Sequence, residues 1–254
     1  MSIDPELQRR SALMTHLRTG LMHSTRVLRK LLRNQSLKAH SRTHTEFYRG
    51  VMASNARRDP DSAIGSDSRE HWMKVGQMQF SYLVSHGLQP GHRILDIGCG
   101  NLRAGWRLMQ YLDTGNYYGV DISPDILLAA LKEIDRQHLQ HKYPHLVLVN
   151  DLTFAFLPDQ AFDVIHAHSV FTHTRADVID QCFASAARIL KPGGFFDLTY
   201  LEGDTFSLID EDFCYPTQTL LDMAASHQLD AAQMADWDYP THRQYKLRLR
   251  RRAT

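Results

Sequence analysis

The fold is decided by the stretch Arg93-Ile94-Leu95-Asp96-Ile97-Gly98-Cys99-Gly100-Asn101-Leu102-Arg103-Ala104-Gly105. Its apolar first half predicts a short buried strand, its glycines predict a tight turn, and residues 106–112 predict a helix. Glycines let a ligand approach the backbone closely, because no Cβ stands in the way. The helix start behind the turn offers free N–H groups to a polar ligand. The stretch therefore predicts a strand, turn and helix that hold a nucleotide-like ligand.

Strands and helices alternate after this unit, which predicts an α/β fold with a parallel sheet covered on both faces. A helix near 216–227 and two further strands near 229–237 and 244–250 are expected to close the chain. Apolar and basic residues alternate in the last strand, as in a half-exposed edge or hairpin strand. The earlier strands are expected at 117–121, 145–151, 161–167 and 195–200, with helices near 123–134 and 175–190.

Composition indicates a cytoplasmic protein with a sizeable core. The chain has 254 residues, of which 43% are hydrophobic, enough for one large domain or one domain with an extension. Its 3 cysteines lie far apart, so neither a disulfide framework nor a CxxC metal pattern is expected, and we predict no bound metal. The sequence also shows no signal peptide and no apolar run near the ~20 residues that a membrane span needs.

The net charge of +1 hides basic ends. Residues 1–45 and 243–252 are strongly basic, whereas the body between them is acidic. Basic ends can contact nucleic acid, but the spread of the charges favours contact with an acidic body. A long amphipathic helix starting near Asp4 carries a leucine-rich stripe that suits docking, and a homodimer through it stays open. We divide the chain into a basic helical extension with its linker, residues 1–60, and a main domain, residues 61–254.

Aspartates end the first three expected strands at Asp96, Asp121 and Asp151. In an open α/β sheet, ligands bind at the carboxyl ends of the strands, near the point where strand order reverses. Asp121 follows Asp96 at close to the spacing of about 20 residues expected for a carboxylate that grips ribose hydroxyls. Such charge-assisted hydrogen bonds are stronger than neutral ones. Asp151 is placed to accept from an exocyclic amine.

A dinucleotide-binding turn is the main alternative for the glycine stretch. Its G-x-G-x-x-G pattern needs glycine at the sixth position so that helix and strand can pack closely. Gly98 and Gly100 match the first two glycines, but the sixth position is Arg103, and Ala104 and Gly105 come later. The missing third glycine favours S-adenosylmethionine (SAM) over a dinucleotide.

Motifs along residues 70–200 resemble those of the class I SAM-dependent methyltransferases. The resemblance implies a Rossmann-like seven-stranded sheet, order 3-2-1-4-5-7-6, with the last strand antiparallel and SAM as cofactor. It also implies cofactor-binding roles for residues of the glycine turn and of the strand ends: Asp96, Gly98, Cys99, Gly100, Arg103, Asp121, Ile122, Asp151, Leu152 and His168. The matching segments are Leu95–Gly100, Gly119–Ser123, Asn150–Leu152, Phe162–Ile165 and Ile189–Gly194. For Arg103, pairing with the SAM carboxylate and pairing with a core acid stay equally open.

Histidines follow the fourth expected strand. The segment Ser169-Val170-Phe171-Thr172-His173 resembles a stretch of bacterial methyltransferases that act on small molecules and sugars. Methyl transfer to oxygen is helped by a base near the hydroxyl proton, and histidine titrates near neutral pH. His168 and His173 are therefore the candidate catalytic bases, while His166 should lie deeper. Transfer without a base also stays open, because SAM already carries the leaving group.

The predicted function is methyl transfer from SAM to a small-molecule or sugar-like hydroxyl. Trp72 and Gln79 are candidates for a lid over the cofactor, and Tyr200 and Trp237 for the acceptor pocket, by fold analogy. An N-methyltransferase or a nucleic-acid methyltransferase is the first alternative. No RNA-binding module is recognisable, so nucleic acid is the less favoured partner. A SAM-binding scaffold without catalysis is the remaining alternative.

Overall fold

The computed structural model describes residues 28, 30–209, 212–237 and 244–252. The chain divides into two compact units, Met1–Val51 and Met52–Thr254. In the first, residues 30–40 are helical, and α2 (His44–Ala56) begins there. Most of the amphipathic helix expected from Asp4, with its docking or dimer face, lies outside the described residues. The predicted boundary at residue 60 stays a prediction.

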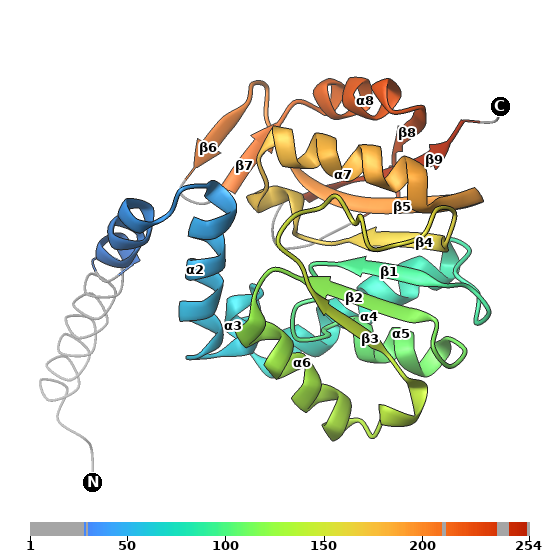
Figure 1. The fold of residues 1–254 in the computed structure, drawn as a ribbon, viewed down its shortest axis with the longest axis horizontal. Helices are drawn as coiled ribbons and strands as arrows, with labels where there is room; N and C mark the ends of the chain where they lie inside the picture. Colours follow the sequence, from blue (N-terminus) through green and yellow to red (C-terminus); the bar gives the residue numbers. More distant parts are fainter. Residues whose placement is uncertain (1–27, 29, 210–211, 238–243, 253–254) are drawn as a thin grey trace, which may run out of the picture. The chain divides into compact units, whose positions relative to one another are not determined.

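Five parallel strands form the body of the sheet, in the order β3-β2-β1-β4-β5 (Figure 1). Next to β5 runs β9, antiparallel, and β8 pairs with β9. This arrangement confirms the predicted sheet, with β8 and β9 as its sixth and seventh strands. The strands are β1 (Ile94–Ile97), β2 (Tyr117–Asp121), β3 (His145–Leu148), β4 (Phe162–Ala167), β5 (Leu190–Glu202), β8 (Leu229–Gln233) and β9 (Gln244–Arg251).

A short hairpin was not predicted. It consists of β6 (Ser207–Ile209) and β7 (Asp212–Tyr215), and β7 pairs in parallel with the end of β5, where Cys214 is opposite Leu201. The segment holds too few apolar residues in alternation to indicate two strands from the sequence. Its pairing extends the sheet beyond the end of β4.

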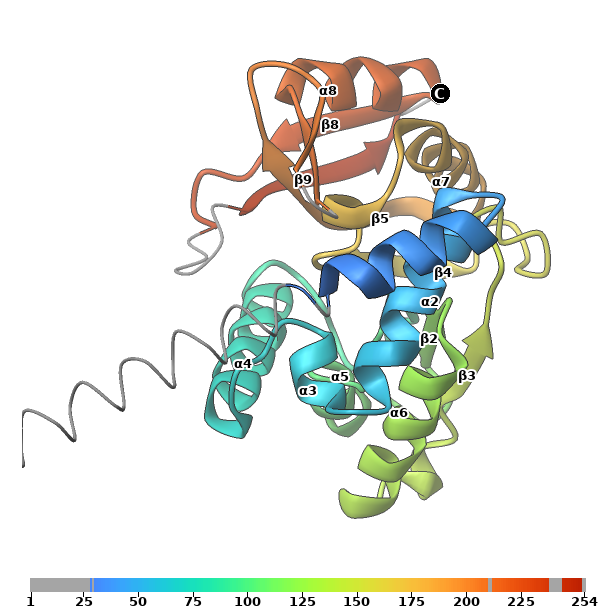
Figure 2. The same ribbon diagram turned by 90° about the vertical axis from the view of Figure 1, so that its left-hand side faces the viewer.

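Helices cover both faces of the sheet, and alternating strand residues meet different helices. One apolar cluster joins Leu95, Ile165 and Phe196 to α7 and α8; the other joins Ile94 and Val164 to α4 and α5. Figure 2 shows α7 and α8 gathered beside β5, β8 and β9, away from α4 and α5. The helices are α3 (Pro60–Ala63), α4 (Arg69–Ser85), α5 (Gly105–Tyr111), α6 (Pro124–Arg136), α7 (Ala176–Ile189) and α8 (Thr217–Ser226), with 3-10 turns η1 (Gln140–Lys142) and η2 (Phe171–His173). Among the described helices, none has the length and apolarity to cross a bilayer.

Polar residues form a row across the sheet on its α4 side. Backbone pairing aligns Asp96 with His166, His166 with Asp197, and Asp197 with Arg248, so the four side chains share one face. All four are buried. The expectation of a half-exposed last strand was therefore wrong for Lys246 and Arg248, because β9 has a neighbouring strand on each side and its basic face is covered. In β9, Lys246 and Arg248 are 1% and 9% exposed.

Candidate functional site

The glycine turn after β1 needs glycine at both positions. Gly98 and Gly100 have φ angles of +65° and +57°, which disfavour a side chain. A Cβ at Gly98 would come within 2.5 Å of Val170 Cγ2, and one at Gly100 within 3.1 Å of Ile64 Cγ2. The turn is thus a backbone surface approached closely from the loop after β4 and from the segment before α4.

The close contact between helix and strand is made by Gly105 rather than by a glycine at position 103. A Cβ at Gly105 would lie 2.5 Å from the Tyr117 hydroxyl oxygen and 2.7 Å from Leu102 Cδ2. The small residue that a dinucleotide turn has at its sixth position therefore comes two residues later here, at the start of α5. Arg103 therefore does not contribute to the contact between α5 and β2.

Asp96 is a buried carboxylate at the end of β1. Its Oδ2 accepts a 2.7 Å hydrogen bond from the Tyr117 hydroxyl. Burial raises the pKa of Asp96 to about 7, against the opposing effect of the Tyr117 bond. Nearby Asp121 raises this pKa further and Arg103 lowers it. A cationic ligand beside Asp96 would favour its ionised form.

Asp121 connects the glycine turn to α6. Its Oδ2 accepts from the Gly100 backbone N–H at 3.0 Å, and its Oδ1 accepts from the Ser123 N–H at 2.9 Å. Burial raises its pKa to about 6, while these backbone bonds lower it. The Ile122 backbone also bonds to this carboxylate, and because a carboxylate offers about four acceptor sites, capacity for a ligand hydroxyl remains. The arrangement fits a ligand that presents two neighbouring hydroxyl groups, such as a ribose.

The other cofactor candidates surround these groups. Cys99 is buried, and its Sγ would lie 3.0 Å from a Cβ at Gly119 in β2. Asp151 is exposed, and its Oδ1 accepts from the backbone and hydroxyl of Thr153, which lowers its pKa. Leu152 and Ile122 belong to the apolar cluster on the α7 side, Leu152 buried and Ile122 partly buried.

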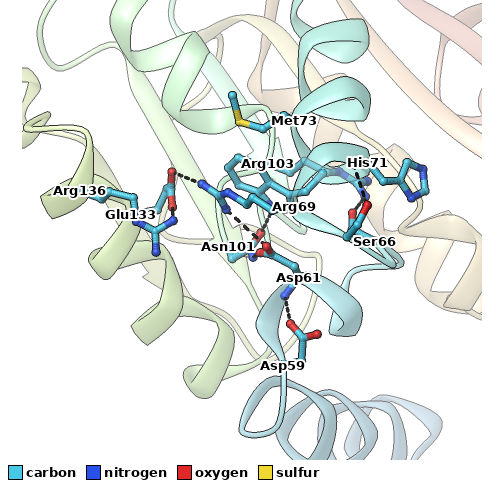
Figure 3. Close-up of polar contacts among 12 residues, drawn as sticks. Asp59, Asp61, Ser66, Arg69, His71, Met73, Asn101, Arg103, Glu133 and Arg136 are labelled. Atoms are coloured by element: carbon cyan, nitrogen blue, oxygen red, sulfur yellow. Dashed lines mark hydrogen bonds and ion pairs between the residues drawn. The ribbon is translucent and has the colours of Figure 1, made fainter.

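A polar network, shown in Figure 3, ties the start of α4 to the turn. The Asn101 Oδ1 accepts from Trp72 Nε1 at 2.8 Å, and its Nδ2 donates to Asp61 at 2.6 Å. Arg69 donates to Asp61 at 3.5 Å and to the buried Glu133 of α6 at 2.8 Å. Its guanidinium also lies 3.6 Å from the centre of the Trp72 ring. The segment from Asp61 to Trp72 is thereby fixed beside the turn.

Arg103 belongs to the same contact region. Its Nη1 donates to the Ile64 carbonyl at 2.9 Å and to the Ser66 hydroxyl at 3.3 Å. It is buried and close enough to Asp96 to lower that residue's pKa. These hydrogen bonds hold the loop before α4, and both roles considered for Arg103 from the sequence stay predictions.

The three histidines at the end of β4 and after it lie in different environments. His166 is 1% exposed, and burial lowers its pKa well below the ordinary value. His168 is buried, and its ring centre lies 6.3 Å from that of His166 and 5.7 Å from that of Trp237. His173 in η2 pairs with Asp212 of the hairpin at 2.9 Å. Of the two candidate bases, His168 lies in the polar region beneath α4, and His173 is held by β7.

The lid and acceptor candidates divide between the two faces of the sheet. Trp72 is fully buried, and Gln79, also buried, lies between Gly76 and Tyr82 on α4. Tyr200 belongs to the α7–α8 cluster, where its hydroxyl lies 2.5 Å from Thr217 Oγ1. Trp237 stacks edge-on with Tyr82 at 4.9 Å, on the same face as His168.

Several site residues were not expected from the sequence. Tyr117 supports Asp96, Asn101 joins the turn to α4 and Asp61, and Lys246 lies buried near Trp237. A tyrosine opening a strand and an asparagine after a glycine turn have ordinary structural uses, so neither stands out. Lys246 belongs to the alternation of basic and apolar residues in β9, but that alternation predicted exposure of the basic residues to solvent.

Comparisons with known proteins agree with this geometry. Residues 95–196 match the family described as a methyltransferase domain. The chain is 27% identical over 143 residues to an uncharacterized methyltransferase of Schizosaccharomyces pombe, covering 52% of this chain and 49% of that protein. It is 28% identical over 113 residues to phosphoethanolamine N-methyltransferase 1 of Arabidopsis thaliana, covering 44% and 22%. The chain thus spans less than half the length of these curated relatives.

A solved structure extends the likeness across most of the fold. It is the magnesium protoporphyrin IX methyltransferase of Synechocystis PCC 6803 with bound SAM. The TM-score is 0.64 at 16% identity, covering 84% of this chain and 99% of that one. At this identity the likeness concerns the fold, while the family match rests on residues 95–196. Residues 95–196 therefore match a methyltransferase domain, and the fold is the Rossmann-like fold of the SAM-dependent methyltransferases.

Proposed function

We propose that this protein transfers a methyl group from SAM to a hydroxyl group of a small, sugar-like molecule. The observation that carries the proposal is the glycine turn at Gly98 and Gly100, held to Asp121 by a hydrogen bond, with His168 on the neighbouring strand end. Two acceptor oxygens and a backbone without side chains suit the ribose and the methionine part of SAM.

The cofactor contacts are assigned by position. SAM, when bound, supplies a methyl group already activated on its sulfonium sulfur. Asp96 and Gly98 would lie along its methionine part, with Cys99, Gly100 and Arg103 in the same turn. Asp121 and Ile122 would lie at the ribose. Asp151 and Leu152 would flank the adenine. The positive charge of SAM would favour ionised Asp96, whose pKa is about 7 in the unliganded protein.

The acceptor side is assigned to His168. It follows the last residue of β4, next to β1, so its backbone lies at the same sheet edge as the glycine turn. A histidine within reach of the acceptor hydroxyl would take its proton as the new bond forms. His166 is less suited to this task, because its lowered pKa makes it a weak base and it lies deeper in the sheet. His173 is already paired with Asp212.

An amine acceptor is the second candidate, because one similar curated protein is named as an N-methyltransferase. The test is methyl transfer from tritium-labelled SAM to monosaccharides and hydroxylated aromatics, each paired with its amino counterpart. The proposal predicts labelled product from hydroxyl members and loss of at least tenfold in rate in His168→Asn. The exposed His141 provides the control His141→Asn, which should retain the rate. Label on amines alone would favour the second candidate, and no label on either, despite SAM binding, would contradict both.

A further inference from the structure

Lys246 is a buried cation without a hydrogen-bonding partner among the described residues. Its side chain rises from β9 beneath α4 and is 1% exposed. Its Nζ lies 4.1 Å from the centre of the Trp237 ring and 4.7 Å from that of Tyr82. Ring faces attract an ammonium group but accept none of its three N–H donors as a carboxylate would. A buried charge left in this state is costly, and such groups commonly mark a site of function.

The carboxylates around Lys246 already have partners. Asp197 lies on β5 opposite Arg248 and accepts two 2.7 Å hydrogen bonds from the Arg248 guanidinium. Asp236 is exposed. Its Oδ1 accepts a hydrogen bond from the Tyr82 hydroxyl at 3.1 Å, and its Oδ2 lies 2.7 Å from His86 Nε2. Each acid near Lys246 is thus engaged by another group. Both carboxylates still favour the ammonium form of Lys246 through their charge, but neither accepts a hydrogen bond from it.

The position of Lys246 suits contact with the methyl acceptor. It is opposite Thr199 in β5, and Thr199 Oγ1 accepts from the backbone of Ser169, the residue after His168. Two strand spacings, about 10 Å, therefore separate the backbones at His168 and Lys246. The Trp237 ring contacts both side chains from the same face. A molecule the size of one sugar or aromatic ring would reach from one to the other.

Other unpartnered polar groups lie on this face. Neither ring nitrogen of His166 nor the Nε2 of Gln79 has a hydrogen-bond partner among the described residues. Gln79 lies on α4 between Gly76, which packs on Arg103, and Tyr82, which packs on Lys246. The face that α4 covers therefore offers donors from both the helix and the sheet, which is typical of a polar binding site.

We propose that Lys246 binds an anionic group, a carboxylate or a phosphate, of the methyl acceptor. The inference rests on the proposed function, because it places the anionic end of the acceptor about one ring away from the hydroxyl at His168. Lys246 is then a residue that selects acceptors by charge. Burial lowers its pKa to about 8, against the opposing effect of Asp197, so the ammonium form still predominates at pH 7. The bound anion would supply the hydrogen-bond acceptors that the described residues do not.

The test uses the full chain, labelled with 13C at lysine Cε and saturated with S-adenosylhomocysteine. Sodium acetate and sodium phosphate are titrated at ionic strength held constant with sodium chloride, and Lys246→Met assigns the Lys246 signal. We expect a saturable shift of the Lys246 signal and a rise in the midpoint of its pH titration. The anion that binds more tightly, acetate or phosphate, then indicates whether the acceptor carries a carboxylate or a phosphate. The same anions should change tryptophan fluorescence, with at least tenfold weaker affinity in Lys246→Met. Lys191→Met, which removes a lysine paired with Asp163, should keep the wild-type affinity.

Two results would overturn the inference. One is a Lys246 signal that responds to acetate and phosphate no more than to chloride. The other is a fluorescence change with equal affinity in wild type and Lys246→Met. Calorimetry with S-adenosylhomocysteine separates this failure from failure of the proposed function. Retained cofactor binding with no anion response removes only the role of Lys246, whereas absent cofactor binding in the wild type removes the methyltransferase proposal.

Discussion

Replacing Gly76 with alanine tests whether α4 packs directly on the glycine turn. A Cβ at Gly76 would lie 2.8 Å from the Arg103 carbonyl carbon, closer still to its oxygen, and 3.0 Å from Arg107 Nη1. Two of these atoms belong to the backbone, so side-chain rotation cannot relieve the clash. Ordinary contact begins at about 3.5 Å, so α4 must retreat by at least about 0.7 Å. That shift would loosen the fully buried Trp72 and Leu83.

Two opposing effects set the magnitude. Alanine in a helix interior is favoured over glycine by about 1 kcal/mol, whereas overpacking costs about 1–3 kcal/mol and occasionally more. Because the clash is with backbone, we expect a net loss near 2 kcal/mol, or a melting temperature lower by about 4–8 °C for a chain of this length.

Calorimetric unfolding and titration with SAM measure the result. SAM affinity should fall as well, because Trp72 and Asn101 move apart. Gly91→Ala is the control, since its Cβ would meet only Asp113 Oδ2, at 3.8 Å. A Gly76→Ala protein that is more stable by about 1 kcal/mol would refute the packing of α4 on the turn.

Asp121→Asn should weaken SAM binding by about 5–30-fold, because hydrogen bonds to a charged group exceed neutral ones by about 1–2 kcal/mol; unchanged affinity in calorimetry would contradict the ribose assignment. The folded-state pKa of Asp96, about 7 against the ordinary value of 3.8, means that the folded state holds its proton more tightly. Stability of the unliganded protein should therefore fall as pH rises from about 4 to 7, by up to about 4 kcal/mol, and Asp96→Asn should flatten this profile in denaturant unfolding. Asn101→Ala should cost about 1–3 kcal/mol by leaving the Trp72 indole N–H buried without its acceptor, whereas Asn116→Ala, at an exposed amide, should cost under about 0.5 kcal/mol.

The sheet was predictable because its signals are local. Apolar runs gave the strands, and the aspartates that follow them marked the carboxyl edge, since a parallel sheet brings strand ends together. Asp121 indeed lies close enough to Asp96 to raise its pKa, in addition to the larger effect of burial. The antiparallel pairing of β9 with β5 also followed from the resemblance.

The acceptor side was not predictable in the same way. The alternation of basic and apolar residues in β9 predicts that they lie on opposite faces of the strand. It does not predict whether the basic face is covered by a helix or by water. Lys246 and Arg248 are buried because α4 crosses above them, with Tyr82 on Lys246 and the His86 carbonyl on Arg248. These contacts join residues more than 160 positions apart, and no local pattern encodes them. Likewise, no local pattern encodes the close approach of Ile64 to Gly100.

The central claim is that the glycine turn and Asp121 bind SAM. Isothermal titration calorimetry of the purified chain with SAM, and separately with NAD, tests it most directly. We predict saturable heat at one SAM per chain, weaker binding in Asp121→Asn, and no heat with NAD. Heat with NAD and none with SAM would contradict it.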